Sequence, residues 1–312
     1  MPSSTNITHV KVLGVYKDAH YEKVKKALQF FSTKKSDLKY EMQLYLPMDY
    51  ELMILDMKKN PKYENTLIRY MKTSTSPLIL VNDKYVVTPK DIYQKLAQDY
   101  EYEDRTYFPL YNRIACSEYA AFYSKLNRKK VEHVYMDFLV KHERHSLPSR
   151  VVFELFLDVV PKTCRNFLEL IKGTTNADGK QLHYKGTTIH RIWKDGFIQG
   201  GDVDHQNGKG GQSIYGKYFE DENYVIRHDK PGLLGMAHEG GKRHTNGSQF
   251  YVTLAPLKAY DNKYVVFGRV VSGFRTIKFL NHLPAFGSKP SVEIEIVDCG
   301  IYKYELISKK RV

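Results

Sequence analysis

The hydrophobic pattern of this 312-residue chain changes near residue 131, and that change constrains its fold more than any other feature. Before this point, apolar stretches alternate between strand-like and helix-like spacing. After it, short strand-like stretches are separated by glycine turns, and Gly14 is the one glycine of 20 that precedes residue 131. At roughly 100–200 residues per domain we expect two domains. The hydrophobic content of 42% is enough for each of them to bury a core.

The first region predicts an α/β domain over residues 8–100. Its string HVKVLGVY, at residues 9–16, is apolar and β-branched, as buried strands are. Val24, Leu28 and Phe31 then recur at helical spacing. The expected order is β-α-β-α-β-β-α, with strands at 9–16, 40–46, 77–81 and 84–87 and helices at 21–31, 50–59 and 89–97.

This order of elements resembles the thioredoxin and glutaredoxin fold. Ser76-Pro77 stands just before the last hairpin, where that family has a cis-proline. The family also carries at least one cysteine in the turn after the first strand, but here the turn is Lys-Asp-Ala-His at residues 17–20, and the first cysteine is Cys116. Because thiol–disulfide exchange needs an attacking thiolate, we expect a redox-inactive domain that serves in packing or docking.

Residues 101–130 are expected to connect the two domains through a helix. Apolar residues recur there at three- and four-residue spacing and form one stripe, which comprises Tyr111, Ile114, Ala115, Tyr119, Phe122, Tyr123 and Leu126. Such a stripe packs on a neighbouring domain or, alternatively, docks on a partner. Residues 303–312 form a basic tail at the other end of the second domain.

The net charge of +13 is spread evenly along the chain. Residues 1–130 carry 22 basic against 15 acidic residues, and residues 131–312 carry 26 against 20. No cluster of basic and aromatic residues accompanies this excess, so we do not expect a nucleic-acid site, which would bind with a steep salt dependence. Attraction to an acidic protein surface explains the same charge.

Cysteine usage and hydropathy indicate a soluble cytoplasmic protein. Cys116, Cys164 and Cys299 are odd in number and far apart, which argues against a disulfide scaffold and a zinc site and favours a reducing compartment. No apolar run approaches the roughly 20 residues needed to span a bilayer. The first eight residues also lack the apolar stretch of a signal peptide.

Residues 131–302 carry a series of short motifs in a sequence that predicts a sheet closed into a barrel. A strand from residue 153 is followed by a helix that Pro161 opens. The later motifs are LHYKG at 182–186, IHRI at 189–192, QGGD at 199–202, GKYFEDEN at 216–223, GMA at 235–237, TNGSQF at 245–250, VVFG at 265–268 and DCG at 298–300.

Together and in this order, these motifs resemble a cyclophilin. The resemblance implies an eight-stranded antiparallel barrel, capped by two helices, with a peptidyl-prolyl cis-trans isomerase site on its outer face. The whole chain is similar to the branch of the family called peptidylprolyl isomerase-like six. The expected architecture is therefore a thioredoxin-like α/β domain at 8–100, a connecting helix at 101–130 and a mainly β cyclophilin-like barrel at 131–302.

The resemblance also places the residues of the isomerase site. Isomerisation rotates a partial double bond with a barrier of about 18–20 kcal/mol and breaks no bond, so it requires no nucleophile, metal or cofactor. The catalyst must stabilise the twisted amide better than the planar one. Arg191 matches the arginine that hydrogen-bonds the prolyl nitrogen. Gln199 and Gln249 match the amides that hold this arginine and the peptide, and Ala237 matches the segment that pairs with the substrate chain.

The proline pocket departs from the family pattern. Glycine at position 196 replaces an aromatic residue. The lost apolar contact amounts to about 1–3 kcal/mol, which corresponds to a factor of roughly ten to a hundred in rate. Aromatic residues nearby could refill the gap if their hydroxyls find partners. The residues expected to bind substrate are Phe197 (usually Met), Ala237, His238 (usually Asn), Tyr251 (usually Phe), Ala259 and Tyr260 (usually Trp-Leu) and Tyr264 (usually His).

Two functions remain open from the sequence. The first is an isomerase that acts, weakly or with narrowed specificity, on X-Pro bonds of partner proteins. The second is a binding protein or scaffold that holds a proline-containing segment on the same face without isomerising its X-Pro bond. The basic, tyrosine-rich composition favours an acidic partner such as tubulin. The resemblance makes the ciliary axoneme and its microtubules an alternative to the cytoplasm.

Overall fold

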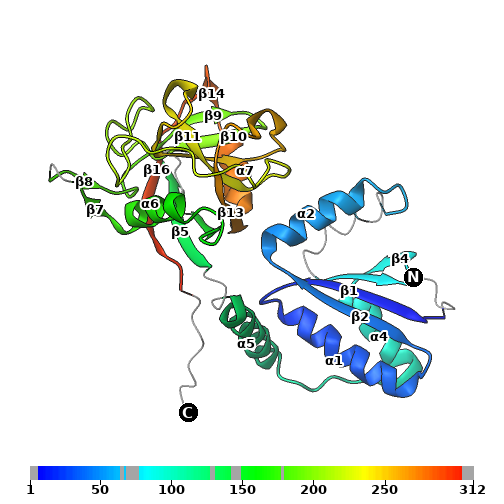
Figure 1. Ribbon diagram of the computed structural model, residues 1–312. Helices are drawn as coiled ribbons and strands as arrows, with labels where there is room; N and C mark the ends of the chain where they lie inside the picture. Colours follow the sequence, from blue (N-terminus) through cyan, green and yellow to red (C-terminus); the bar gives the residue numbers. More distant parts are fainter. Residues whose placement is uncertain are drawn as a thin grey trace, which may run out of the picture. The chain divides into compact units, whose positions relative to one another are not determined.

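The computed structural model describes residues 6–63, 67, 77–126, 131–141, 149–176 and 179–303. The chain forms two compact units, one that extends to Lys125 and one that comprises Leu126–Lys303 (Figure 1). The predicted connecting helix therefore belongs to the first unit instead of forming a separate segment. Within the described ranges, no helix has both the length and the apolar character needed to cross a membrane.

The first unit is an α/β domain with the predicted order of elements. These are β1 (His9–Val15), α1 (Ala19–Lys34), β2 (Lys39–Tyr45), α2 (Pro47–Lys58), β3 (Leu78–Val81), β4 (Tyr85–Val87), α4 (Pro89–Tyr100) and α5 (Phe108–Leu126). The strand order is β2-β1-β3-β4, with β1 and β2 parallel and the other neighbours antiparallel. The likeness to thioredoxins stays a prediction, and the Ser76–Pro77 bond lies outside the described residues.

Helices cover both faces of this sheet (Figure 1). On one face Val24 of α1 and Ile92 of α4 share a core with Val12 of β1. On the other face Ile54 of α2 packs in a second core with Leu13. Successive side chains of a strand point to opposite faces, so neighbouring residues of β1 enter different cores. This explains why β1 is apolar almost throughout.

Two helices extend beyond their predicted ranges. α2 begins at Pro47 instead of residue 50, because a proline in the first helical turn needs no N–H partner and already has a helical φ. α4 continues to Tyr100 and ends where Glu101 adopts a left-handed conformation with φ of 53°. Thr88 caps the start of α4 by accepting a hydrogen bond from the Asp91 N–H.

Helix α5 begins at Phe108, within the predicted connecting segment 101–130, because Asp104 holds the residues before it in an irregular conformation. Its carboxylate accepts hydrogen bonds from the Thr106 N–H at 3.1 Å, the Tyr111 hydroxyl at 2.9 Å and Lys26 Nζ at 3.1 Å. Burial raises the pKa of this carboxyl, but the donors outweigh burial and lower the pKa to about 2. The segment before α5 is thereby anchored to α1.

The apolar stripe of α5 packs on the first unit, which is the packing alternative of the two predicted for it. Tyr111, Ala115 and Tyr119, spaced by four residues, are buried. Phe122 stacks on Tyr16 with ring centroids 4.5 Å apart. Ile114 was expected in the same stripe but is 38% exposed, because it lies on the neighbouring face of the helix. The side chains of residues 123–126 lie outside the described part of the chain.

The second unit is the antiparallel barrel with two capping helices that the resemblance implies. Its elements are β5 (Glu132–Val140), β6 (Ser149–Leu155), α6 (Pro161–Lys172), β7 (Thr174–Thr175), β8 (Gln181–Leu182), β9 (Ile189–Trp193), β10 (Phe197–Gly200), β11 (Leu233–His238), η2 (Glu239–Gly241), β12 (Asn246–Thr253), η3 (Lys258–Tyr260), β13 (Val266–Ser272), α7 (Phe274–His282), β14 (Ala285–Phe286), β15 (Lys289–Pro290) and β16 (Ile294–Ile301). The strand order of the barrel is β16-β5-β6-β13-β11-β12-β10-β9. A bridge between Thr188 and Glu295 brings its two ends together.

Helix α6 positions the long loop that precedes β11. Glu222 of that loop accepts hydrogen bonds from the N–H groups of Lys162 at 3.0 Å and Thr163 at 2.9 Å. A carboxylate there satisfies the free donors at the start of the helix and opposes the positive end of its dipole. The buried Asn166 accepts from the Ile214 N–H and donates to the Gly247 carbonyl, both at 2.9 Å. The helix therefore holds the loop and the start of β12 together.

A pair of carboxylates joins α1 to α5. Glu22 is only 5% exposed, and Lys25 Nζ lies 3.4 Å from its carboxylate and 2.5 Å from that of Glu118. Burial, followed by the hydrogen bond and the charge of Glu118, raises the pKa of Glu22 to about 7, against the effect of Lys25. The folded state thus binds this proton more tightly than the unfolded chain, in which the pKa is about 4.3. The unfolding free energy therefore falls as pH rises from about 4 to about 7.

We predict that Glu22→Gln stabilises the first unit at pH 8 by about 1–2 kcal/mol, after allowance for solvent screening, and has little effect at pH 5. The amide stays neutral, as the protonated carboxyl does at pH 5. Hydrogen–deuterium exchange of α1 amides, compared between variant and wild type at each pH, measures the difference. The exposed Glu41, changed to Gln, is the control. Equal protection of the α1 amides in Glu22→Gln and wild type at pH 8 would contradict the raised pKa of Glu22.

Candidate active site

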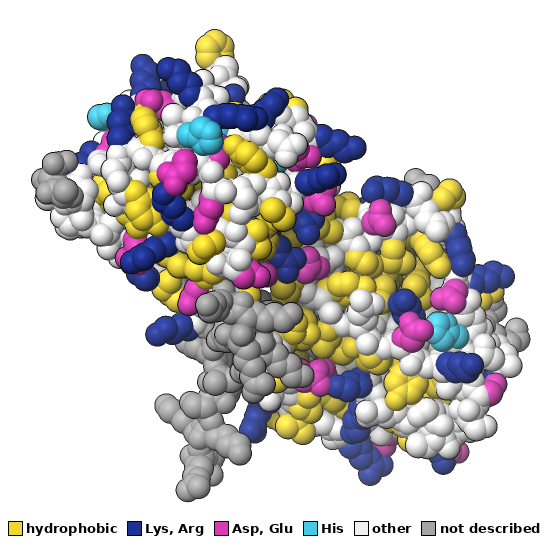
Figure 2. All heavy atoms as spheres, viewed as in Figure 1, with side chains coloured by type: hydrophobic (Ala, Val, Ile, Leu, Met, Phe, Trp, Pro, Cys, Tyr) yellow, Lys and Arg dark blue, Asp and Glu magenta, His cyan; other side chains and the backbone are white. Residues whose placement is uncertain are grey.

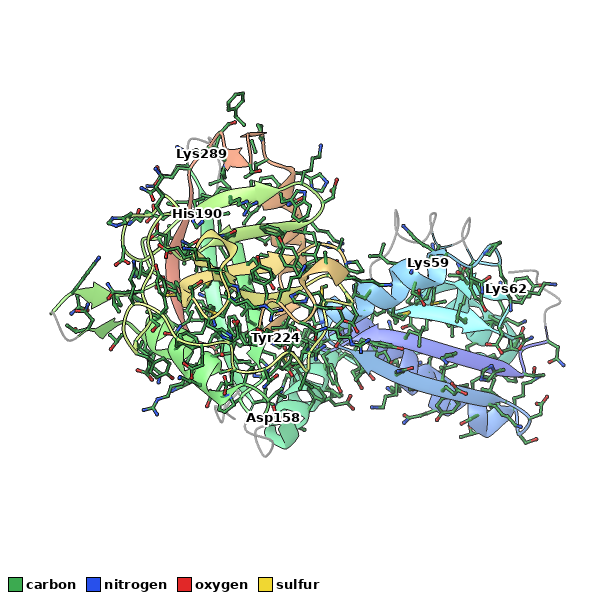
Figure 3. The ribbon with its side chains drawn as sticks, turned by 45° about the horizontal axis from the view of Figure 1, so that its top comes forward. Lys59, Lys62, Asp158, His190, Tyr224 and Lys289 are labelled. Carbon is green, nitrogen blue, oxygen red and sulfur yellow. The ribbon has the colours of Figure 1, made fainter. Side chains whose placement is uncertain are left out.

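One groove of about 1150 Å³ on the barrel collects nine of the ten predicted site residues: Arg191, Phe197, Gln199, Ala237, His238, Gln249, Tyr251, Tyr260 and Tyr264. Typical small-molecule sites have about 300–1,000 Å³, so this groove has room for a peptide segment. His190 and Lys289, which also line it, lie at the same end of the barrel in Figure 3.

The strand register explains how residues far apart in sequence meet in this groove. Arg191 on β9 pairs with Gln199 on β10, Gln199 pairs with Tyr251 on β12, and Tyr251 pairs with Gly235 on β11. Directly opposite residues of neighbouring strands point to the same face of a sheet. The register therefore places a guanidinium, an amide and a phenol in one row across four strands.

A chain of amides orients Arg191. Gln249 Nε2 donates to the carbonyls of Gly208 at 3.0 Å and Gly210 at 2.7 Å. Its Oε1 is thereby turned to accept from Gln199 Nε2 at 2.8 Å. The Gln199 Oε1 then accepts from Arg191 Nη1 at 3.4 Å. Because a carbonyl can only accept, the two loop carbonyls determine the direction of every bond in this chain.

The loop that supplies these carbonyls is built around Asp202. The residue is fully buried, and its carboxylate accepts from the N–H groups of five residues at 2.9–3.1 Å: Asp204, His205, Asn207, Gly208 and Gly210. Burial raises the pKa of the carboxyl, but the backbone donors outweigh burial and hold the pKa below its ordinary value. Asp202 thus positions Gly208 and Gly210, and through them Gln249.

An aromatic cluster forms the pocket beside Arg191. Phe197, Tyr251 and Ala237 are buried, and the half-buried Tyr260 and Tyr264 pack against them. The ring of Tyr260 lies 5.9 Å from Phe197, 5.8 Å from Tyr251 and 4.6 Å from Tyr264, measured between centroids. The Arg191 guanidinium carbon lies 5.3 Å from the Phe197 ring centroid. The four predicted aromatic residues therefore pack together beside Arg191.

The Tyr251 hydroxyl finds its partner in the long loop that precedes β11. It lies 2.5 Å from Nε2 of the buried His228, whose Nδ1 lies 3.1 Å from the Asp261 carboxylate. Because a carboxylate only accepts, Nδ1 carries the proton and Nε2 accepts from the phenol. Burial lowers the pKa of His228 against the effect of Asp261, which keeps the ring neutral. A side chain at Gly235 would lie 2.4 Å from this hydroxyl, so the glycine makes room for it.

Trp193 does not line the groove itself, but it packs against the aromatic cluster, and the sequence argument missed it. Its indole lies edge-on to Phe197 at 5.2 Å and 6.4 Å from Tyr260, and a Cβ at Gly196 would come within 3.0 Å of it. The indole thus covers the side of the pocket that Gly196 leaves open. Its position offered a signal, because a residue two places after Arg191 on a strand points to the same face.

His238 does not present its ring to the groove as predicted. The side chain is 1% exposed, and Nε2 lies 2.7 Å from the buried Asp221 carboxylate. Asn246 and the Tyr224 hydroxyl donate to the same carboxylate. Burial raises the pKa of Asp221, but His238 and the other donors outweigh it and lower the pKa. The His238 ring stacks on Tyr264 at 4.6 Å and so supports the pocket wall from behind.

Ala259 is exposed and does not line the groove. It belongs to the short turn η3, in which successive residues point in directions about a third of a turn apart. Tyr260 enters the aromatic cluster from this turn, and Ala259 consequently faces solvent. The prediction that Ala259 contacts substrate therefore has no support in the geometry of the groove.

A family model identifies this barrel and its groove. The model for cyclophilin type peptidyl-prolyl cis-trans isomerase/CLD matches residues 138–301, which are more than half of the chain. This chain belongs to the cyclophilin family. The match includes every residue described in the groove and confirms the resemblance that the motifs suggest.

Relatives of two kinds share this cyclophilin domain. The "Probable inactive peptidyl-prolyl cis-trans isomerase-like 6" of Homo sapiens is 33% identical over 93% of this chain and 91% of its own length. Its Mus musculus counterpart is 32% identical over 94% and 90%. The "NK-tumor recognition protein" of Mus musculus is 48% identical over 51% of this chain, but the match covers only 11% of that protein.

In the cyclophilin groove, the guanidinium of Arg191 is a hydrogen-bond donor that lies beside an apolar pocket. A proline ring in the aromatic pocket would place its amide next to the Arg191 guanidinium, which has several N–H donors and stays charged. Donation to the amide nitrogen opposes its conjugation with the carbonyl, and so favours the twisted state. Among the described residues, no group of three or more His, Cys, Asp and Glu side chains could hold a metal ion.

We predict that Asp202→Asn lowers the unfolding free energy of the barrel by about 2–4 kcal/mol, because the amide replaces one acceptor oxygen by a donor that faces backbone N–H groups. Urea unfolding followed by fluorescence reports on the barrel, since Trp193 is the single tryptophan of the chain. Wild type should also lose this contribution as pH falls below about 4, the unfolded pKa, whereas the variant should not. The exposed Asp195, changed to Asn, is the matched control, and an equally small effect of both changes would contradict the role of Asp202.

We predict that Tyr251→Phe costs about 1–3 kcal/mol of unfolding free energy, because it leaves His228 Nε2 buried without a donor. Tyr260→Phe provides the comparison, since the half-buried Tyr260 hydroxyl has no hydrogen bond among the described residues. The same fluorescence-detected urea unfolding measures both variants. Equal stabilities of the two would show that the hydrogen bond from Tyr251 to His228 contributes nothing.

Proposed function

We propose that this chain binds X-Pro segments of other proteins in the barrel groove and isomerises them weakly. The observation that carries the proposal is the amide chain from the loop carbonyls to Arg191, which holds a guanidinium beside an aromatic pocket. We assign the amide-nitrogen donor to Arg191, its orientation to Gln199 and Gln249, and proline contact to Phe197, Tyr251, Tyr260 and Tyr264. No cofactor takes part in this scheme.

The packing of the pocket argues for weak turnover. Tyr260 contacts Phe197, Tyr251 and Tyr264 within the pocket, so an incoming proline ring must compete with side chains that already bury each other's surface. The relatives that match most of this chain are named "Probable inactive", which supports reduced activity. Both points are consistent with a retained donor in a narrowed pocket.

A second function follows from the same packing. A groove that accepts the peptide but leaves the proline amide away from Arg191 would hold the segment without isomerising the X-Pro bond. The size of the groove, about 1150 Å³, favours this alternative, because a peptide can bind there through contacts remote from the proline. We further propose an acidic protein surface such as a tubulin tail as the partner, in the cytoplasm or on ciliary microtubules, on the basis of the net charge of +13.

The deciding experiment is exchange NMR on a short peptide that contains Ala-Pro, with the full chain as catalyst. We predict cis-trans exchange above the uncatalysed rate and a loss of about a hundredfold in Arg191→Ala, as expected on removal of one donor aimed at developing charge. Arg191→Lys, which keeps the charge but loses the planar set of donors, should recover little.

The outcomes separate the two functions. Exchange that depends on Arg191 supports the enzyme. Peptide resonances that shift without exchange, equally in wild type and Arg191→Ala, support the holding protein and overturn catalysis. Peptide resonances that neither shift nor exchange overturn both. Trp193 fluorescence in each variant verifies that the barrel is folded, and Arg191 is exposed, so its replacement should not unfold it.

A further inference from the structure

Three cations line the groove from three different segments. Arg191 belongs to β9, Lys209 to the loop that Asp202 organises, and Lys289 to the β14–β15 hairpin. None of them forms an ion pair within the described part of the chain. Among the described residues, the hydrogen-bond acceptor of Arg191 is the neutral Gln199 amide. Their charges are therefore available to a bound segment.

Two acidic residues line the same groove, and one of them is already engaged in an ion pair. Glu293 lies 2.7 Å from Lys141 Nζ. Glu239 forms no ion pair with a described residue, so it leaves one unpaired carboxylate at the groove against three unpaired cations. The groove consequently offers a bound segment more unpaired positive than negative charge. By contrast, acidic and basic side chains are interspersed over the surface visible in Figure 2.

Backbone contacts hold both lysines at the groove. Gly208 and Gly210, on either side of Lys209, donate their N–H groups to Asp202 at 2.9 and 3.1 Å. The turn before Lys289 has two residues with positive φ, Gly287 at 53° and Ser288 at 74°, as in a tight hairpin turn. The Ser288 carbonyl accepts from the N–H of Ile192, next to Arg191, at 2.7 Å. The lysines thus project from segments whose backbone is anchored beside the site.

We propose that the groove selects X-Pro segments that carry an anionic side chain, carboxylate or phosphate, within a few residues of the proline. This inference rests on the proposed binding of X-Pro segments and adds the substrate class. Exposed ion pairs are individually weak, and two of them strengthen binding by about three- to tenfold at low ionic strength. The preference should shrink as salt shortens the screening length from about 10 Å at 0.1 M to about 3 Å at 1 M.

A nucleic acid is the competing anionic ligand for such a surface. Proteins that bind nucleic acid through phosphates commonly make six to ten such contacts, and this groove supplies three cations beside an aromatic pocket. The pocket adjoins Arg191, which is the cation that the proposed proline contact also uses. These features favour a peptide over a nucleic acid as the ligand of the groove.

The test uses the full chain and blocked peptides around one Ala-Pro bond. One peptide is neutral, with Gln at all flanking positions, and others carry Glu or phosphoserine at single positions from three before to three after the proline. Dissociation constants are measured from Trp193 fluorescence and from peptide line broadening, at low and high salt. We expect at least one Glu peptide to bind three- to tenfold tighter than the neutral one, and the matching phosphoserine peptide to exceed it because its charge is larger.

The variants locate the preference. The double change Lys209→Gln and Lys289→Gln should bring the ratio of acidic to neutral affinity close to one. Lys230→Gln, which removes an exposed lysine that does not line the groove, should leave that ratio unchanged. Fluorescence-detected urea unfolding verifies that the variants are folded.

Each other outcome counts against the proposal. Equal binding of neutral and acidic peptides overturns the anionic preference while the proposed function stands. A preference that survives in the double variant overturns the assignment to this groove. No binding of any peptide overturns the proposed function and this inference together. If a single-stranded oligonucleotide binds as tightly as the best acidic peptide, the proposal is overturned and nucleic acid becomes the assigned ligand of the groove.

Discussion

The buried carboxylate of Asp202 is the interaction on which the groove depends. Five backbone N–H groups converge on it, which closes the loop after β10 and turns the carbonyls of Gly208 and Gly210 toward Gln249. Those carbonyls orient two amides, and the amides orient Arg191. The same loop carries Lys209 at the edge of the groove. An ionised carboxylate can be buried here because every bond it accepts replaces one that water would provide.

The pocket shows how a barrel can keep a site while changing its walls. A tyrosine at position 251 brings a hydroxyl into a buried place, and that hydroxyl is satisfied by His228 and accommodated by Gly235. The opening at Gly196 is covered by Trp193. Both of these residues have a partner elsewhere in the fold, so the pocket stays packed and the buried Tyr251 hydroxyl is paired.

Sequence periodicity predicted the α/β class of the first unit, and the motifs predicted the cyclophilin barrel, but the boundaries of the elements were predicted less well. Strand and helix spacing identified the predicted elements of the first unit, and the motifs placed nine of the ten site residues in one groove. The start of α5 was missed because Asp104 binds Lys26 of another helix, a contact between residues far apart in the chain. The contact of the His238 ring with Asp221 could not be predicted, because the two residues meet only in the folded barrel.

The sequence by itself determined the order of elements, the absence of a cysteine from the turn at residues 17–20, and the set Arg191, Gln199 and Gln249, because spacing and motif identity are properties of the chain. The tertiary structure decided which side chains face the groove, which hydroxyls are paired, and which charges stay unpaired. These depend on strand register and on contacts between distant segments. A one-residue change in register would turn Tyr251 to the opposite face, and only the paired strands of the barrel settle that choice.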